Sequence, residues 1–361
     1  MARKFDRKLI LENGEVYEGY GFGEYCDRVC EIIFNTSMVG YQEIIYNPAY
    51  TYQGVVMTYP LIGNYGITDD VFEDKVASVS ALFVREYNDS PSNFRSTKTL
   101  SEVLEENHIP GIYGFDTRKL TRSLRSNGTM RGLVTGIDTS VEEGLEIIKN
   151  TPEPRDAVAS VSCKRRWYLR TSNRTHNVVA IDCGLKHSVI RYLNNKECNV
   201  TVVPWNTSAE EIINMKPDGI FFSDGPGCPE DVPELIELVR SFKGKYPIFG
   251  IGLGHQIICL AYGAKMTRLK FGHHGSNYPV KNLDTGKIFI TSQCNNYTVD
   301  MGSLENTDLR LIHVSILDNT VAAVECAKDG VICVEYDPES APDFNVVDKF
   351  IANMKEAESN A

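Results

Sequence analysis

The stretch Pro247-Ile248-Phe249-Gly250-Ile251-Gly252-Leu253-Gly254-His255-Gln256 predicts a buried strand, a very tight turn and the start of a helix. The strand is short and apolar, and Gly252 is the central residue of the turn. Glycine adopts backbone angles that are strained for other residues, as a very tight turn can require. The stretch therefore predicts an α/β fold in which strands feed directly into helices.

The C-terminal half continues this alternation. Strands are expected at 178–182, 200–204, 219–222 and 248–251, and helices at 185–194, 208–215, 233–242 and 254–262. The βαβα order predicts a parallel sheet covered on both faces, with ligands at the carboxyl ends of its strands. Gly225, Gly227 and Gly252 follow such ends. The paired glycines fit a backbone-lined substrate pocket, although a plain tight turn would need them equally.

The N-terminal half predicts a mixed, β-rich domain. A hairpin is expected from Leu9 to Gly19, with further strands at 30–35 and 54–59. Helices are expected at 100–107 and from about 116, capped by Asp116 or Thr117. The stretch between the halves lacks sustained periodicity. We therefore place a first domain at 1–150, a connecting segment at 151–176 and a second domain at 177–361.

Composition excludes several classes of function. The net charge of −11 disfavours nonspecific binding to nucleic acid or anionic membranes, and no apolar run approaches the roughly 20 residues of a membrane span. The basic N-terminus precedes no apolar signal-peptide core, so a cytoplasmic protein is expected. The 10 cysteines show no Cys-x-x-Cys pair and no zinc-like spacing. Most are expected to be small buried hydrophobes in a reducing compartment.

The turn at Gly252 lies in the pattern Gly-Ile-x-Leu-Gly-His-Gln, which resembles the nucleophile elbow of class I glutamine amidotransferases. In that family x is the cysteine that attacks the side-chain amide of glutamine. From about residue 8 to residue 353, the chain resembles the small subunit of carbamoyl phosphate synthetase (synthase). The motifs that carry this resemblance are Phe34–Glu43, Thr58–Gly66, Asp116–Arg122, Pro226–Pro229, Gly254–Gln256 and Phe271–Asn277.

The resemblance implies a β-rich N-terminal domain followed by a class I amidotransferase domain with a mostly parallel, doubly wound sheet. It also implies a large synthase subunit as partner in a heterodimer. That subunit makes carbamoyl phosphate, for arginine and pyrimidine synthesis, from bicarbonate, ATP and ammonia delivered through a tunnel. No cofactor is expected in this chain. ATP and Mg are expected only in the large subunit, and no Gly-x-x-x-x-Gly-Lys-Ser/Thr phosphate loop occurs here.

The catalytic positions that the resemblance implies are altered. The nucleophilic cysteine is replaced by Gly252, which has no side chain and cannot attack. The histidine base is replaced by Asp337, while the orienting glutamate is retained as Glu339. An unperturbed aspartate, with a pKa of about 4, is a weak base toward a thiol with a pKa of about 8.5.

The substrate pocket that the resemblance implies is altered as well. Ala49 stands where the family has a serine, and Asn296 stands where it has a glycine, so a strained backbone is expected at Asn296. The other pocket positions are Gly225, Gly227, Leu253, Gln256, Cys294 and Tyr297. We interpret these joint changes as a pseudo-glutaminase subunit that supports ammonia-dependent synthesis by the large subunit.

Several alternatives remain open at this stage, including whether the chain is itself an enzyme. The altered pocket, with Cys294, Asn296, Tyr297 and Asp337, is compatible with a regulatory or ligand-binding module. The chain is also compatible with an assembly protein for an unrelated enzyme. Ordinary glutamine hydrolysis would require that Gly252 is not the natural residue. A catalytic Cys–His pair could also have moved to other residues. The candidates, for which structural roles are the simpler interpretation, are Cys228, Cys294, His255, His273 and His274.

Overall fold

The structure is a computed structural model that describes residues 4–69, 72–74 and 76–360. The chain forms two compact units. The N-terminal unit comprises Met1–Pro154 and Lys270–His274, and the C-terminal unit comprises Arg155–Leu269 and Gly275–Ala361. The segment between the predicted domains, where no element was expected, contains helix α5 (Ala157–Val161) and strand β10 (Trp167–Leu169).

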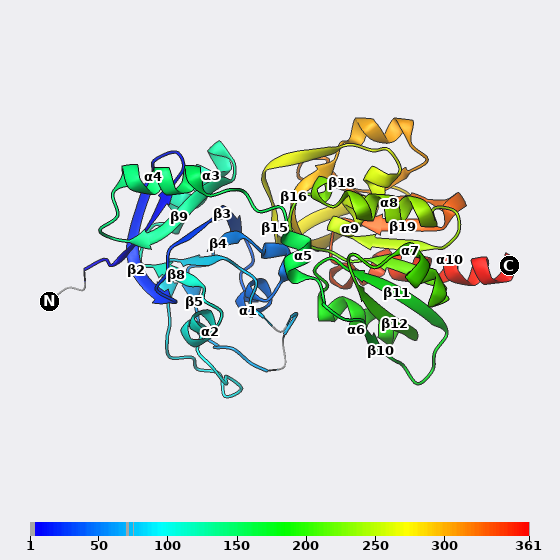
Figure 1. Ribbon diagram of the computed structural model, residues 1–361, viewed down its shortest axis with the longest axis horizontal. Coiled ribbons are helices and arrows are strands. Elements are labelled where there is room, and N and C mark those ends of the chain that lie inside the picture. Colours follow the sequence, from blue (N-terminus) through cyan, green and yellow to red (C-terminus); the bar gives the residue numbers. More distant parts are fainter. Residues whose placement is uncertain (1–3, 70–71, 75, 361) are drawn as a thin grey trace. The chain divides into compact units, whose positions relative to one another are not determined.

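The N-terminal unit is built on a closed seven-stranded barrel in the order β1-β2-β8-β6-β4-β3-β9 (Figure 1). The barrel core is apolar and includes Leu9, Ile32, Val56 and Phe83. The elements of this unit are β1 Arg7–Leu11, β2 Val16–Gly23, β3 Arg28–Asn35, α1 Tyr41–Ile45, β4 Gln53–Met57, β5 Leu61–Ile62, β6 Ala81–Val84, β7 Glu86–Tyr87, α2 Leu100–Glu106, β8 Pro110–Tyr113, α3 Thr117–Asn127, β9 Met130–Gly136 and α4 Val141–Asn150.

The expected β-rich character of this unit is confirmed, with differences at the ends of its elements. Strands β1 and β2 pair antiparallel, with Leu9 opposite Tyr17, as the predicted hairpin requires. Strand β4 ends at Met57, so the last two residues expected in that strand lie outside it. The cap of α3 is Asp116 rather than Thr117, because the Asp116 side chain accepts a hydrogen bond from the N–H of Lys119.

The C-terminal unit contains a ten-stranded sheet in the order β10-β12-β11-β13-β14-β19-β18-β17-β15-β16. The pairings from β12 through β11, β13 and β14 to β19 are all parallel, and antiparallel strands extend both sides. The remaining bounds are β11 His176–Asp182, β12 Cys198–Pro204, β13 Gly219–Phe222, β14 Ile248–Ile251, β15 Met266–Asn282, β16 Ile288–Val299, β17 Arg310–Ser315, β18 Val321–Cys326 and β19 Val331–Val334.

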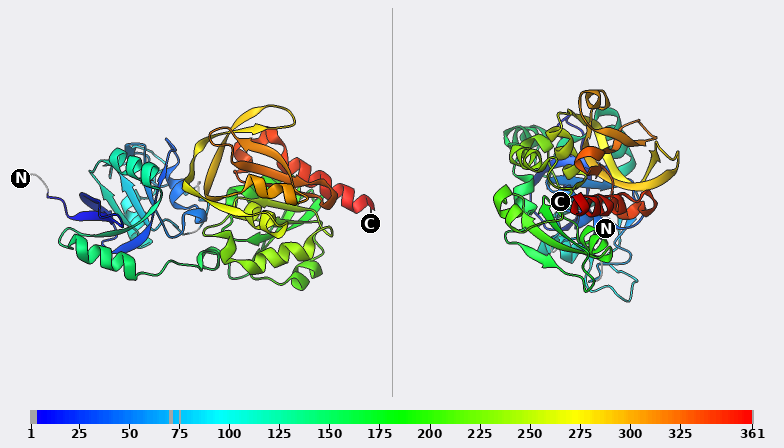
Figure 2. Two further views of the ribbon diagram at one scale, coloured as in Figure 1. Left: turned by 90° about the horizontal axis from the view of Figure 1, so that it is seen from above. Right: turned by 90° about the vertical axis from the view of Figure 1, so that its right-hand side faces the viewer.

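Helices cover both faces of this sheet, as predicted. Alternate residues of one strand point to opposite faces: Ile181 of β11 packs with residues of α7, α8 and α9, whereas Ala180 packs with residues of α6 and α10. Figures 1 and 2 show the last of these helices, in red, carrying the chain to its C-terminus. The helices are α6 His187–Asn195, α7 Ala209–Asn214, α8 Pro233–Phe242, α9 Leu253–Ala261 and α10 Val346–Asn360.

Buried clusters lie on both faces of the sheet, and the turns at its carboxyl edge carry the candidate site.

Within the described ranges, every helix is too short or too polar to cross a lipid bilayer.

Candidate functional site

The predicted strand–turn–helix at Gly252 is confirmed. Strand β14 ends at Ile251, helix α9 begins at Leu253, and Gly252 between them has φ 51° and ψ −114°. The turn is packed tightly, because a Cβ on Gly254 would lie 2.2 Å from the carbonyl oxygen of Phe222. Gly252 is buried in this turn and supplies no side chain.

Asp224, which the sequence analysis did not single out, lies directly against the turn. Its Oδ1 accepts hydrogen bonds from the N–H of Leu253 at 3.1 Å and from the N–H of Gly225 at 2.8 Å. A Cβ built on Gly252 would lie 2.1 Å from the same oxygen. The carboxylate in this position would therefore have to move to admit a side chain at the elbow.

The two N–H groups that hold Asp224 have the arrangement of an oxyanion hole. Such a site consists of preorganised donors about 2.7–3.1 Å from the oxygen on which negative charge develops, and one donor commonly follows the nucleophile. Leu253 follows the elbow residue, and Gly225 supplies the second donor. The carboxylate of the chain itself thus occupies the position that a reacting carbonyl oxygen would need.

Asp224 titrates in the neutral range. Burial raises the pKa of its carboxyl to about 7, and Asp337 adds to this effect, whereas Lys186 and the two backbone donors oppose it. Burial thus disfavours the charged form of this carboxyl, whereas the two N–H donors stabilise it.

The base position is occupied by an ion pair. Asp337 contacts the ammonium group of Lys186, which is buried. Burial lowers the pKa of Lys186, but Asp337, Glu339 and Asp224 outweigh it, so that the pKa is raised overall. Asp337 is therefore engaged by an ammonium group instead of facing a thiol at the elbow.

Glu339 is retained in the sequence, but its neighbour is Ser188 rather than the histidine that the resemblance implies. It accepts a hydrogen bond from the hydroxyl of Ser188 at 2.8 Å, and its pKa is raised, chiefly by burial. Together Asp224, Asp337 and Glu339 form a three-carboxylate cluster around Lys186. This cluster is a group of carboxylates around one buried ammonium group rather than a Cys–His–Glu relay.

The paired glycines have steric reasons of their own. A Cβ on Gly225 would lie 2.1 Å from the carbonyl oxygen of Cys183, and Gly227 has φ +92°. Both positions therefore require glycine for the turn itself. This explanation holds whether or not a substrate binds there.

The remaining predicted pocket residues differ in burial and in whether their side chains already have hydrogen-bond partners. The Gln256 side chain donates to Glu335 at 2.8 Å and to the carbonyl oxygen of Tyr297 at 3.1 Å, so its amide is already engaged. Cys294 and Asn296 lie on β16 and are half-buried. The expected backbone strain at Asn296 is wrong: this residue continues an extended strand and is not among the described residues with positive φ. Ala49 is buried in the N-terminal unit.

The histidines considered for a relocated pair are all buried. His255 has no exposed surface and contacts Cys333 and Cys259. His273 and His274 are buried residues that group with the N-terminal unit, whereas Cys228 and Cys294 group with the C-terminal unit.

Comparison with known proteins assigns the family. The family model described as "Carbamoyl-phosphate synthase small chain, CPSase domain" matches residues 9–134, and "Glutamine amidotransferase class-I" matches residues 179–351. The carbamoyl phosphate synthase small chain of Fusobacterium nucleatum is 46% identical over 354 residues, which cover 97% of this chain and 98% of that protein. The chain belongs to the carbamoyl phosphate synthase small-chain family.

Other members of the family are similarly close. The carbamoyl phosphate synthase pyrimidine-specific small chain of Bacillus subtilis is 45% identical over 98% of this chain and 97% of its own length. A small chain of Bacillus cereus is 49% identical over 93% of this chain and 91% of its own length. The resemblance inferred from the motifs is therefore confirmed at the level of the family and of the class I amidotransferase domain.

Proposed function

We propose that this chain is a carbamoyl phosphate synthase small subunit that does not hydrolyse glutamine and that supports ammonia-dependent synthesis by a large subunit. The observation that carries the proposal is the elbow itself. Gly252 offers no nucleophile. The Asp224 carboxylate occupies the space that a side chain at position 252 would need, and it accepts hydrogen bonds from the two N–H donors beside that position. Covalent catalysis at this turn has neither an attacking atom nor a free oxyanion site.

The base position supports the same proposal. A general base must be free to accept a proton from the nucleophile. Asp337 is held by Lys186 instead, and the nearby Glu339 lies against Ser188. Restoring a thiol alone would therefore leave the reaction without a proton acceptor.

The proposed role in supporting a large subunit rests on the family features that this chain retains. The chain matches relatives over nearly their full length, including the N-terminal region that carries the small-chain match. A large subunit is the partner that membership of this family implies. In this proposal the large subunit binds ATP and Mg²⁺, and this chain contributes binding surface rather than chemistry.

Ordinary glutamine hydrolysis is the competing function, and the match to the class I glutamine amidotransferase family favours it. The positive φ of Gly252 also fits a turn that once held a nucleophile. The filled elbow and the Lys186–Asp337 pair oppose it, because both would have to rearrange before glutamine could react.

Reconstitution with the cognate large subunit tests the supporting role. We expect the two chains to co-elute and the large subunit to make carbamoyl phosphate from ammonium faster, or to survive incubation longer, when this chain is present. The control is the large subunit alone at the same concentration. Failure of the chains to associate, with an unchanged rate from ammonium, would reject the proposed role.

The variant Gly252→Cys is expected to fold, to lose about 1–3 kcal/mol of unfolding free energy, and to remain inactive toward glutamine. The loss arises because the new Cβ meets Asp224 and because φ is positive at this position. Chemical denaturation and a glutamate-release assay measure the two effects.

Gly263→Cys is the matched control, since Gly263 has φ +95° but no atom lies within 4 Å of the point that its Cβ would occupy. It should show the backbone cost without the collision, and so a smaller loss than Gly252→Cys. Strong glutaminase activity from Gly252→Cys would show that Asp337 suffices as a base and would contradict the proposal.

A further inference from the structure

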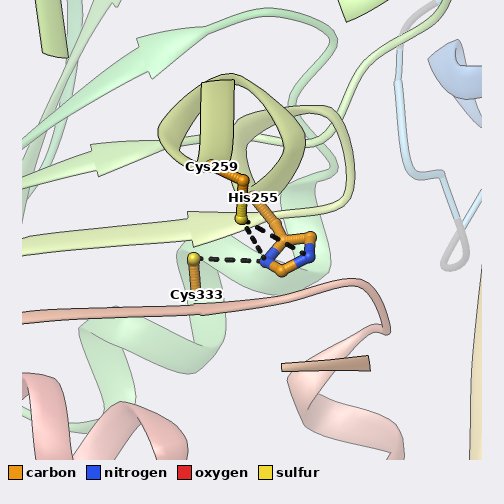
Figure 3. Close-up of side chains that lie close together, drawn as sticks. All are labelled: His255, Cys259 and Cys333. Carbon is orange, nitrogen blue, oxygen red and sulfur yellow. Dashed lines mark hydrogen bonds between the residues drawn. The ribbon is translucent and has the colours of Figure 1, made fainter. Parts of the chain in front are cut away.

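A cluster of one histidine and two cysteines lies beneath the elbow. His255 and Cys259 project from α9, one helical turn apart, toward Cys333 on β19 (Figure 3). The Nδ1 atom of His255 lies 3.1 Å from Sγ of Cys333 and 3.9 Å from Sγ of Cys259. One ligand atom from each residue lies within 4.8 Å of the other two, and all three side chains have no exposed surface.

These separations suit a small thiophilic metal ion. With metal–sulfur bonds of about 2.3 Å and metal–nitrogen bonds of about 2.0–2.1 Å, the ligands of a tetrahedral ion lie roughly 3.5–3.8 Å apart. The observed 3.1 Å and 3.9 Å bracket that range, so small side-chain shifts suffice. Two sulfurs and an imidazole are the three protein ligands of some zinc sites, in which a water or another small molecule completes the tetrahedron.

A carboxylate lies beside the other ring nitrogen. Oε2 of Glu335 is 3.7 Å from Nε2 of His255, and it is a buried oxygen with no hydrogen-bond partner. The other oxygen of Glu335 accepts a hydrogen bond from Gln256 at 2.8 Å, which fixes the carboxylate. Histidines that ligate a metal commonly donate their second N–H to a carboxylate, which orients the ring.

We propose that Nδ1 of His255 and the Sγ atoms of Cys259 and Cys333 bind one Zn²⁺ ion, with Glu335 as a positioning residue. Binding releases the two thiol protons, and the divalent ion then balances the charge of the two thiolates. Because the ligands are fully buried, the ion would enter during folding and join α9 to β19 beneath the elbow. The proposal uses none of the residues on which the proposed function rests.

Metal content tests the proposal on the full-length chain, produced in zinc-supplemented medium and dialysed against a chelator. We expect about one equivalent of zinc per chain by elemental analysis. Cys259→Ser and Cys333→Ser should each lose it and unfold at a lower temperature, whereas Cys183→Ser, at another buried thiol, should keep it. Refolding with Co²⁺ should give thiolate-to-cobalt charge-transfer absorption that both ligand variants lack.

The positioning role of Glu335 has its own readout. Glu335→Gln should weaken zinc binding by about 10–100-fold in competition with a chelator, while the cobalt spectrum keeps its two-thiolate character. A merely structural role would leave zinc affinity unchanged.

Three results would overturn the proposal. The first is metal-free protein with no cobalt absorption even after refolding with the ion. The second is a Cys259–Cys333 disulfide in the purified chain, which removes both thiolates. The third is zinc that survives Cys259→Ser and Cys333→Ser but is lost in His176→Ala, since His176, Asp218 and Glu358 form another group of potential ligands among the described residues.

Discussion

Replacing the buried Lys186 by methionine is expected to lower the free energy of unfolding by up to about 3 kcal/mol, because it leaves the half-buried Asp337 and Glu339 and the buried Asp224 without their cation. Lys186 is buried, pairs with Asp337 and faces Glu339 and Asp224 as well. Methionine keeps most of the side-chain volume, so the loss reports charge rather than a cavity. Denaturant titration monitored by far-ultraviolet circular dichroism measures it.

Two further variants make this result specific. Lys196→Met removes an ion pair with Asp348 whose side chains are 33% and 45% exposed, and should cost no more than about 1 kcal/mol. Adding Asp337→Asn to Lys186→Met removes one orphaned charge and should recover part of the loss. Equal, small effects of Lys186→Met and Lys196→Met would show that the three carboxylates do not depend on Lys186.

Asp224→Asn is expected to stabilise the chain increasingly as pH rises from about 4 to about 7. Burial raises the pKa of Asp224 to about 7 in the folded state, from 3.8. The folded state therefore binds more protons than the unfolded state between these values. The contribution of Asp224 to stability accordingly falls as pH rises through this window, by about 1.4 kcal/mol per pH unit and on the order of 4 kcal/mol in total.

Asparagine removes this titration while its side-chain oxygen can still accept from Leu253 and Gly225. The measurement is the unfolding free energy of both proteins in buffers across that range. The difference between variant and wild type should grow up to about pH 7 and level off above about pH 8. A difference that does not change with pH would show that burial does not shift the protonation equilibrium of Asp224.

The sequence sufficed for the parts of the fold that local patterns determine. The run of strands and helices from β11 to α9 follows the hydrophobic periodicity of the sequence. Gly252 marks the tight turn between β14 and α9, where its φ is positive. The closure of the N-terminal barrel was not predicted. It depends on β1 pairing with β9, and no local pattern specifies such a distant partner.

The candidate site was predicted only in part, for the same physical reason. Asp224 is adjacent to Gly225 in the sequence, yet its importance arises from its position against a turn nearly thirty residues later. Lys186 likewise meets Asp337 only through the parallel sheet. The expectation for Asn296 failed because a strand accommodates asparagine where a tight turn would not. The His255–Cys333 contact joins residues too distant for any metal-binding spacing to reveal.

The central claim, that this small subunit does not hydrolyse glutamine, is tested most directly by the source of nitrogen in the product. The complex of this chain with its large subunit would be supplied with bicarbonate, ATP and either ammonium or amide-labelled glutamine, and carbamoyl phosphate and glutamate would both be measured. The account predicts product from ammonium, and from glutamine neither labelled product nor glutamate above a control without the chain. Labelled carbamoyl phosphate formed from glutamine at a rate comparable to that from ammonium would contradict it.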